Sequence, residues 1–299
     1  MQYDDYTQRK KFPIISCGEI GTVWRSQSFN QSLFHRNFGK APLAIGDAPD
    51  AGVSWLGCYN LHFRALWEGD APMASEPAQH SFITLEGVDG AGKSTQARLL
   101  ARALELAGYQ VVSLREPGGT AISEKIRALL LDPANTAMGD TCELLLYEAA
   151  RAQLVHEVIA PALAAGKVVL CDRFYDSTTC YQAFADGLDR QMVRDANNLA
   201  VTGTHPALTL VYHITPEQAA LRMAARGAAD RMEAKGMAFQ ERVYQGFCSI
   251  AAEEPDRVKL IDATASIADV FAQTVELVRA YGLDIPQDAV AAALAQEAE

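Results

Sequence analysis

The sequence predicts an α/β fold in which helices cover both faces of a five-stranded parallel sheet. After residue 80, short apolar segments alternate with longer segments of helical periodicity, and glycine or proline ends several of them. Parallel strands need crossover connections, which are usually helical, so this alternation indicates a parallel sheet. The predicted strands are Phe82–Leu85, Val111–Leu114, Val168–Cys171, Leu208–Ile214 and Val258–Ile261.

Helical segments fill the intervals between these strands. One runs over Thr95–Ala107 and is closed by Gly108, and another runs over Glu143–Ala160 and is expected to stop at Pro161. A last helix is expected over Asp288–Ala298. We therefore predict one α/β domain over residues 81–282 and a short helical tail over residues 283–299.

The first 80 residues differ from the rest of the chain. They hold all three tryptophans but show no sustained period of 2 or 3.6 residues. The segment that starts at Met73 leads directly into the first strand, as a native N-terminus would. We interpret residues 1–80 as an irregular N-terminal extension or the product of an upstream start site, with Met73 as a candidate true start. The alternative is a small accessory or targeting segment.

Composition limits the classes of partner. The formal net charge is −11, which argues against nucleic acid or an anionic membrane as the main partner. The six cysteines are scattered without metal-ligand spacing, and this pattern favours reduced thiols in a cytoplasmic protein. No apolar run approaches the length of a membrane span. We therefore expect neither a nucleic-acid nor a membrane partner.

A phosphate-binding loop follows the first strand. Residues Gly87–Ser94 match the pattern GxxxxGK[ST], with a strand before them and a helix after them. Backbone N–H groups of such a loop converge on phosphate oxygens, Lys93 supplies a cation for the β and γ phosphates, and Ser94 supplies a hydroxyl for Mg²⁺. We thus predict ATP and Mg²⁺ as ligands. The predicted nucleotide contacts are Gly87, Val88, Asp89, Gly90, Ala91, Gly92, Lys93, Ser94 and Thr95.

Two further segments carry charged and aromatic residues that suit a second ligand. The second strand leads into Arg115–Thr120, whose proline and paired glycines favour a tight turn, and Arg127 follows. Tyr147 and Arg151 are four residues apart and so share one helix face. An aromatic ring and a guanidinium on one face can stack on a base and hydrogen-bond its edge.

The third strand ends in an Asp-Arg pair. Asp172 is a candidate ligand for Mg²⁺, and Arg173 is a candidate bridge between donor and acceptor phosphates. Farther along, charged and small residues surround Gly227, which suits a mobile lid that carries Arg226 and Arg231.

Together the phosphate loop and these segments resemble the thymidylate kinases, which convert dTMP and ATP to dTDP and ADP. The resemblance covers about residues 82–280, and its most specific stretch is Asp172–Gln182. It implies the three-layer fold of phosphate-loop nucleotide-binding proteins, dTMP as the second substrate, and a homodimer.

The resemblance also implies roles for single residues. Arg127 matches an arginine near the acceptor phosphate. Tyr147, where the family more often has phenylalanine, matches the ring that stacks on thymine, and Arg151 matches the side chain that reads its O4 atom.

The remaining matches concern the sugar, the base and the lid. Asp89 matches the carboxylate that accepts the deoxyribose 3′-hydroxyl. Tyr181 matches a ring that crowds a ribose 2′-hydroxyl, and Gln182 matches a residue near the base. Because the phosphate loop carries no arginine, Arg226 and Arg231 are the expected catalytic cations of the lid, beside Lys93 and Arg173.

Two other functions remain open from the sequence. A deoxynucleoside kinase, or another monophosphate kinase of the same fold, would share the phosphate loop, and a deoxynucleoside kinase needs a general base, for which Glu116 is a candidate. A nucleotide-binding module without activity would carry damaged catalytic positions, whereas Lys93, Ser94, Asp172 and Arg173 are all present.

Overall fold

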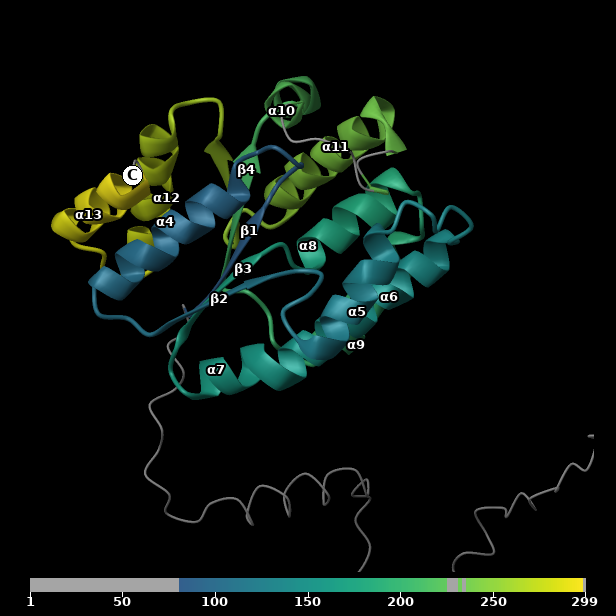
Figure 1. The fold of residues 1–299 in the computed structure, drawn as a ribbon, viewed down its shortest axis with the longest axis horizontal. Helices are drawn as coiled ribbons and strands as arrows, with labels where there is room; N and C mark the ends of the chain where they lie inside the picture. Colours follow the sequence, from purple (N-terminus) through teal and green to yellow (C-terminus); the bar gives the residue numbers. More distant parts are fainter. Residues whose placement is uncertain (1–80, 225–230, 233–234, 298–299) are drawn as a thin grey trace, which may run out of the picture. The chain divides into compact units, whose positions relative to one another are not determined.

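The predicted parallel sheet is confirmed in the computed structural model, which describes residues 81–224, 231–232 and 235–297 (Figure 1). The strand order is β2-β3-β1-β4-β5, and all four pairings are parallel. The expectations for residues 1–80, including Met73, and for Arg226 lie outside the described residues. The strands are β1 (Phe82–Glu86), β2 (Val111–Arg115), β3 (Val168–Asp172), β4 (Leu208–His213) and β5 (Val258–Asp262).

Strand β1 lies at the centre of the sheet because its sequence tolerates burial on both faces. All five of its residues are buried, and its threonine, Thr84, pairs its hydroxyl with that of Thr209 on β4 at 2.8 Å. In the register of β1 with β3, Leu85 lies beside Asp172. The segments that follow these two strands therefore start next to each other, at the carboxyl edge of the sheet.

One face of the sheet is covered by α4 (Lys93–Leu106) and α12 (Ile267–Ala280), and α13 (Gln287–Glu297) packs against α4 (Figure 1). The buried residues of α4 recur at helical spacing, as a helix with one apolar face requires. Ala289, Val290 and Ala293 of α13 join the same apolar core. The predicted C-terminal tail thus packs into the main domain.

The other face and the carboxyl edge carry the remaining helices. Helices α5 and α6 lie side by side, as do α6 and α9, and α11 contacts β5 (Figure 1). Within the described segments, no helix is long and apolar enough to cross a membrane. The bounds are α5 (Ala121–Leu131), α6 (Asp140–Leu154), α7 (Ala160–Ala164), α8 (Tyr175–Thr178), α9 (Arg190–Val201), α10 (Pro216–Met223) and α11 (Met237–Glu253).

The expected helix stop at Pro161 is wrong. Helix α6 ends at Leu154, a π-helical segment η1 (Val155–Ile159) follows, and α7 continues from Ala160. Pro161 lies in the first turn of α7, where the N–H that proline lacks is not needed by the new helix. The π-helical segment shifts the hydrogen-bond pattern, so the chain passes the proline without turning away.

Candidate active site

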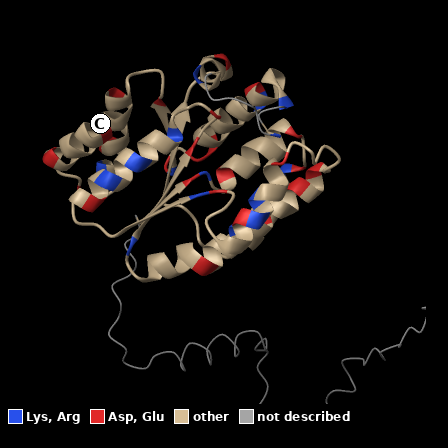
Figure 2. Ribbon diagram, viewed as in Figure 1, with Lys and Arg blue, Asp and Glu red and all other residues tan. Residues whose placement is uncertain are grey.

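A cavity of about 280 Å³ opens at the carboxyl edge of the sheet, where the phosphate loop and the segments after β2 and β3 meet. Figure 2 shows acidic and basic residues interspersed along these segments. Predicted site residues that do not line the cavity are Gly87, Val88, Ala91 and Arg231. Those that do are Asp89, Gly90, Gly92, Lys93, Ser94, Thr95, Arg127, Tyr147, Arg151, Asp172, Arg173, Tyr181 and Gln182.

The phosphate loop packs closely on the elements behind it. Gly87 and Gly90 have positive φ angles, and a Cβ atom would lie 2.7 Å from the Tyr212 carbonyl oxygen at the first and 2.6 Å from that of Ala219 at the second. Only glycine avoids both the strain and the contact at these positions. The motif therefore holds its shape through backbone packing against β4 and α10.

Lys93 is buried and folds back over the loop. Its Nζ atom donates to the carbonyl oxygens of Gly87 at 3.0 Å and Val88 at 2.8 Å. Burial and the nearby Arg173 guanidinium lower the pKa of Lys93 to about 8, against the opposing effect of Asp89 and other carboxylates. An ammonium group held by carbonyl oxygens can exchange these contacts for phosphate oxygens.

The side chains of Ser94, at the start of α4, and Asp172, at the end of β3, contact each other. The Ser94 hydroxyl donates to a carboxylate oxygen of Asp172 at 2.6 Å. Both groups offer the hard oxygen atoms that Mg²⁺ prefers, and Mg²⁺ takes few ligands from the protein because it keeps waters and phosphate oxygens. This donor pair fits the predicted metal, and the described residues hold no cluster of three or more metal-ligating side chains.

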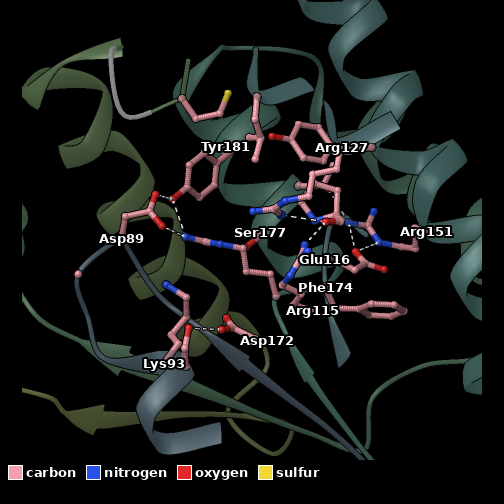
Figure 3. Close-up of a pocket in the computed structure, with 18 of the residues that line it drawn as sticks. Asp89, Lys93, Arg115, Glu116, Arg127, Arg151, Asp172, Phe174, Ser177 and Tyr181 are labelled. Carbon is pink, nitrogen blue, oxygen red and sulfur yellow. Dashed lines mark hydrogen bonds and ion pairs between the residues drawn. The ribbon is translucent and has the colours of Figure 1, made fainter. Parts of the chain in front are cut away.

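Arg173 connects the phosphate loop with the turn after β3. Its backbone is left-handed, with φ 71°, which is unusual for a residue with a side chain. The guanidinium donates to the Gly87 carbonyl oxygen at 3.1 Å, to Asp89 at 2.5 Å and to the Ser177 hydroxyl at 2.9 Å. Two of these acceptors, Asp89 and Ser177, are labelled in Figure 3. Five hydrogen-bond donors on a planar group suit it to this branching position.

The Asp89 carboxylate accepts hydrogen bonds from two side chains of the site. Besides Arg173, it accepts from the Tyr181 hydroxyl at 3.4 Å. Although burial raises the pKa of Asp89, the charges of Arg173 and Lys93 lower it to about 2. The carboxylate is thus ionised at neutral pH and can accept a hydrogen bond from a ligand hydroxyl.

Arg151 lies deeper than its predicted role in reading a base requires. Its side chain is 2% exposed, and its guanidinium pairs with Glu116 at 2.8 Å and Glu148 at 2.5 Å. It also donates to Thr178 at 3.0 Å and Asn197 at 3.3 Å. Sequence reasoning missed these partners, because nothing in their spacing shows that they meet. Glu116, Phe174 and Thr178 line the cavity beside it.

One end of the cavity carries two arginines, Arg115 at the end of β2 and Arg127 on α5. Arg115 donates to the Pro117 carbonyl oxygen at 3.0 Å, and Arg127 donates to the same oxygen at 2.8 Å. The sequence predicted Arg127 as a site residue but assigned no role to Arg115. Tyr147 lines the same end and is half-buried.

Arg231 and Gln182 meet at Glu143, a buried residue of α6 that the sequence did not single out. Arg231 lies 2.6 Å from one Glu143 oxygen and donates to the Leu130 carbonyl oxygen at 2.7 Å. Gln182 donates to the other Glu143 oxygen at 2.7 Å, and Lys235 pairs with it at 3.2 Å. These two contacts of Arg231 are therefore with α5 and α6.

Comparisons with known proteins agree on one family. Residues 85–274 match the family model described as thymidylate kinase. The chain is 46% identical over 201 residues to a thymidylate kinase of Exiguobacterium sibiricum, covering 67% of this chain and 95% of that protein. It is 48% identical over 207 residues to one of Geobacter sulfurreducens, covering 65% of this chain and 97% of that protein.

A solved structure gives the same result for the fold. The crystal structure of thymidylate kinase from Ehrlichia chaffeensis superposes with a TM-score of 0.56 at 33% sequence identity. The match covers 67% of this chain and 98% of that chain. The similarity thus spans nearly the whole length of each relative.

The Glu116–Arg151 pair predicts a dependence of stability on pH. Burial raises the pKa of Glu116 to about 7, although Arg151 opposes the shift. The folded state then holds the Glu116 proton more tightly than the unfolded chain does. The stability that this proton contributes is fully present below the unfolded pKa and is lost as pH rises through about 7. Glu116→Gln cannot ionise at this position. Its free energy of unfolding, measured relative to that of wild type, should therefore rise by on the order of 1–3 kcal/mol as the pH increases from about 5 to about 8.

Denaturant unfolding at several pH values measures this difference. Glu217→Gln, at an exposed position on α10, is the matched control and should keep the pH dependence of the wild type. If the stability of wild type and that of Glu116→Gln changed with pH in the same way, the raised pKa of Glu116 would be contradicted.

Proposed function

The chain belongs to the thymidylate kinase family, and we propose that it transfers the γ-phosphoryl group of ATP to dTMP, giving dTDP and ADP. One observation carries this proposal beyond the family match: a single cavity joins the phosphate loop at one end to Arg127, Tyr147 and Arg151 at the other. The first end suits a triphosphate, and the second suits a phosphorylated nucleoside with a base to stack.

The donor side rests on Lys93, Ser94 and Asp172. We propose that Lys93 exchanges its carbonyl contacts for the β and γ phosphates. Ser94 and Asp172 would hold Mg²⁺, which neutralises charge on the phosphates when bound. The backbone N–H groups of the loop from Gly87 to Thr95 would bind the remaining phosphate oxygens.

The acceptor side would be built from α5, α6 and the segment after β3. Arg127 would contact the acceptor phosphate, Tyr147 would stack on thymine, and Arg151 would read its O4 atom. Because the Arg151 donors already face protein acceptors, base reading by Arg151 requires one of these hydrogen bonds to be shared with thymine. Gln182 would lie near the base.

The sugar contacts would fall on Asp89 and Tyr181. The ionised Asp89 carboxylate is a suitable acceptor for the 3′-hydroxyl. Tyr181 is buried beside it, and its ring packs under the Arg173 guanidinium at 5.3 Å. A buried ring in this position leaves little room for a 2′-hydroxyl.

Positioning and charge would supply the catalysis. The second pKa of a phosphate monoester is about 6, so the acceptor is mostly ionised at neutral pH and needs no general base. Arg173, between the phosphate loop and the acceptor side, would neutralise charge on the transferred group. Arg226 and Arg231 would add positive charge from the segment between α10 and α11.

One observation disfavours a deoxynucleoside kinase. Such an enzyme needs a free base for the 5′-hydroxyl, and Glu116 is the candidate. Glu116 is 5% exposed, and one of its oxygens accepts a hydrogen bond from Arg151 Nε at 2.9 Å and lies 2.8 Å from an Nη atom of the same guanidinium. A carboxylate held this way is poorly placed to take a proton from a substrate.

We also propose that the enzyme is a homodimer in the cytoplasm. Supporting the dimer, exposed apolar side chains gather on three helices that lie beside one another, at seven-residue spacing on α5 and on α9. The described cysteines are free thiols, in keeping with a reducing compartment. The exposed apolar residues are Ile122, Leu129, Leu145, Met192 and Leu199.

Lys93→Ala tests the phosphoryl transfer itself. The loss of one pre-positioned cation at the phosphates should lower kcat at least about 100-fold in a coupled assay of ADP release with dTMP. Lys125→Ala, at an exposed position on α5, is the control and should keep the wild-type rate. Near-wild-type kcat in Lys93→Ala would remove this lysine from the reaction.

Tyr181→Ala tests the discrimination against a 2′-hydroxyl. Removal of the ring should open space beside Asp89, so the preference for dTMP over the corresponding ribonucleotide should fall about 10-fold or more in kcat/KM. Tyr181→Phe keeps the ring and should keep the preference. An unchanged preference in Tyr181→Ala would place the discrimination elsewhere.

Leu199→Asp tests the dimer. A carboxylate in the centre of an apolar interface should shift the mass in solution from twice 32.4 kDa towards 32.4 kDa, as measured by sedimentation equilibrium. Leu221→Asp introduces the same charge at an equally exposed leucine on α10 and should leave the mass unchanged. A monomeric wild type, or a dimer in Leu199→Asp, would exclude this face.

A further inference from the structure

Glu86 is a fully buried carboxylate to which the proposed mechanism gives no role. It is the last residue of β1, directly before the phosphate loop, and its side chain is 0% exposed. One carboxylate oxygen accepts from the backbone N–H groups of Phe174 at 2.7 Å and Ser177 at 3.1 Å. The other accepts from the Ser177 hydroxyl at 2.6 Å.

These contacts replace a missing helix cap. Helix α8 begins at Tyr175, and the residue before it, Phe174, makes no side-chain capping hydrogen bond. The first N–H groups of a helix have no partner within the helix and must find acceptors elsewhere. Glu86 of β1 accepts from two of these groups, one of which, the Ser177 N–H, also donates to the Phe174 carbonyl oxygen at 3.1 Å, so the start of α8 is tied to the end of β1.

The same carboxylate reaches the Arg173 side chain through Ser177. The Ser177 hydroxyl donates its proton to Glu86 and accepts from an Nη atom of Arg173 at 2.9 Å. The hydroxyl carries one proton, so its donation to Glu86 leaves its lone pairs for the guanidinium. Glu86 thereby fixes the direction of the Ser177 O–H group, so that its oxygen faces Arg173 as a hydrogen-bond acceptor.

The Arg173 backbone needs such support. Its φ of 71° is in the left-handed region, which costs free energy for a residue with a side chain and persists only where the surroundings enforce it. The N–H group of Arg173 donates to the Leu85 carbonyl oxygen at 2.9 Å. Leu85 and Glu86 of β1 thus hold the residue by its backbone and, through Ser177, by its guanidinium.

We propose that Glu86 is a positioning residue for phosphoryl transfer, which acts through Ser177 to hold the Arg173 guanidinium between the phosphate loop and the acceptor. The inference rests on the proposed role of Arg173 in the transfer. Glu86 directly precedes Gly87 of the phosphate loop and accepts hydrogen bonds from Phe174 and Ser177 after β3. It therefore holds these two segments of the site in a fixed position relative to each other. It does not touch a substrate.

The charge state of Glu86 supports this role. Burial raises its pKa to about 7, and the Asp176 charge adds to the shift, whereas Arg173, Ser177 and the Phe174 N–H group oppose it. Only the ionised carboxylate accepts all three donors without giving up an oxygen to its own proton. Assays at about pH 8 therefore examine Glu86 mainly in its ionised form.

The test compares Glu86→Gln with Ser177→Ala and the double variant. Glutamine has the shape of glutamate but presents an NH₂ group to Ser177, which reverses the polarity of that hydrogen bond. We expect kcat with dTMP and ATP to fall about 10- to 100-fold in each single variant, with both KM values within about 3-fold of wild type. The double variant should lose little more than the worse single variant, because both changes break the same connection.

Thr84→Val is the matched control for a purely structural effect. It removes a buried polar contact two residues earlier on β1, away from Arg173, and should lower the melting temperature without lowering kcat. If Glu86→Gln lowers the melting temperature but not kcat, or if the losses in the double variant multiply, the inference is overturned. If Glu86→Gln does not fold, Ser177→Ala alone still decides, since an unchanged kcat there excludes the connection.

A crystal structure of Glu86→Gln separates this inference from the proposed function. The expected result is a displaced Arg173 side chain that has lost its hydrogen bond to Ser177. An Arg173 side chain unchanged from a wild-type crystal structure would overturn the inference, whatever the activity. A wild-type enzyme without dTMP phosphorylation would instead refute the proposed function, and the pair of structures would still decide whether Glu86 positions Arg173.

Discussion

The parallel pairing of β1 with β3 is the constraint on which the site depends. It places Leu85 beside Asp172, so that the two segments leaving these strands begin at the same point of the sheet edge. One segment is the phosphate loop, and the other carries the Asp-Arg pair. The short distances between Ser94 and Asp172 and between Asp89 and Arg173 follow from this adjacency. A slip of this register would separate every one of these pairs.

Buried charge is the second common feature of the site. Arg151 is fully buried with its two carboxylates, and Arg173 pairs with Asp89 where both side chains are partly exposed. Such pairs add little net stability, because desolvation of both charges offsets their attraction, but the loss of one partner leaves the other uncompensated. The raised pKa values of Glu86 and Glu116 have the same cause, since burial disfavours the ionised form of each carboxylate. The arrangement gives fixed orientation, which phosphoryl transfer requires, at the expense of stability.

The helical layers serve different purposes on the two sides of the sheet. Helix α4 carries Lys93 and Ser94 at its start and is covered by α13, whose alanines and Val290 extend the core over it. On the opposite side, α5, α6 and α9 present exposed apolar residues, and α5 and α6 also line the cavity with Arg127, Tyr147 and Arg151. A second copy bound to that outer face would therefore rest directly on the helices that bind dTMP in the proposed function.

The sequence by itself determined the sheet, its five strands and the phosphate loop. These features are local: a buried parallel strand is a continuous apolar run, and the loop needs glycines and a lysine at fixed spacing. Local reasoning failed at Pro161, because a proline ends a helix only if no new helix starts there, and the π-helical segment before it cannot be inferred from propensities. Motif spacing also predicted most of the residues that line the cavity together, but not how deeply each one lies.

Only the tertiary structure decided the partners of those residues. That Arg151 pairs with Glu116, which is 35 positions away in the sequence, depends on how α6 packs beside the end of β2. That Glu86 meets Ser177, which is 91 positions away, depends on the pairing of β1 with β3. The physical reason is the same in both cases: a hydrogen bond is specified by the geometry of its two groups, and no local pattern encodes the meeting of two distant segments.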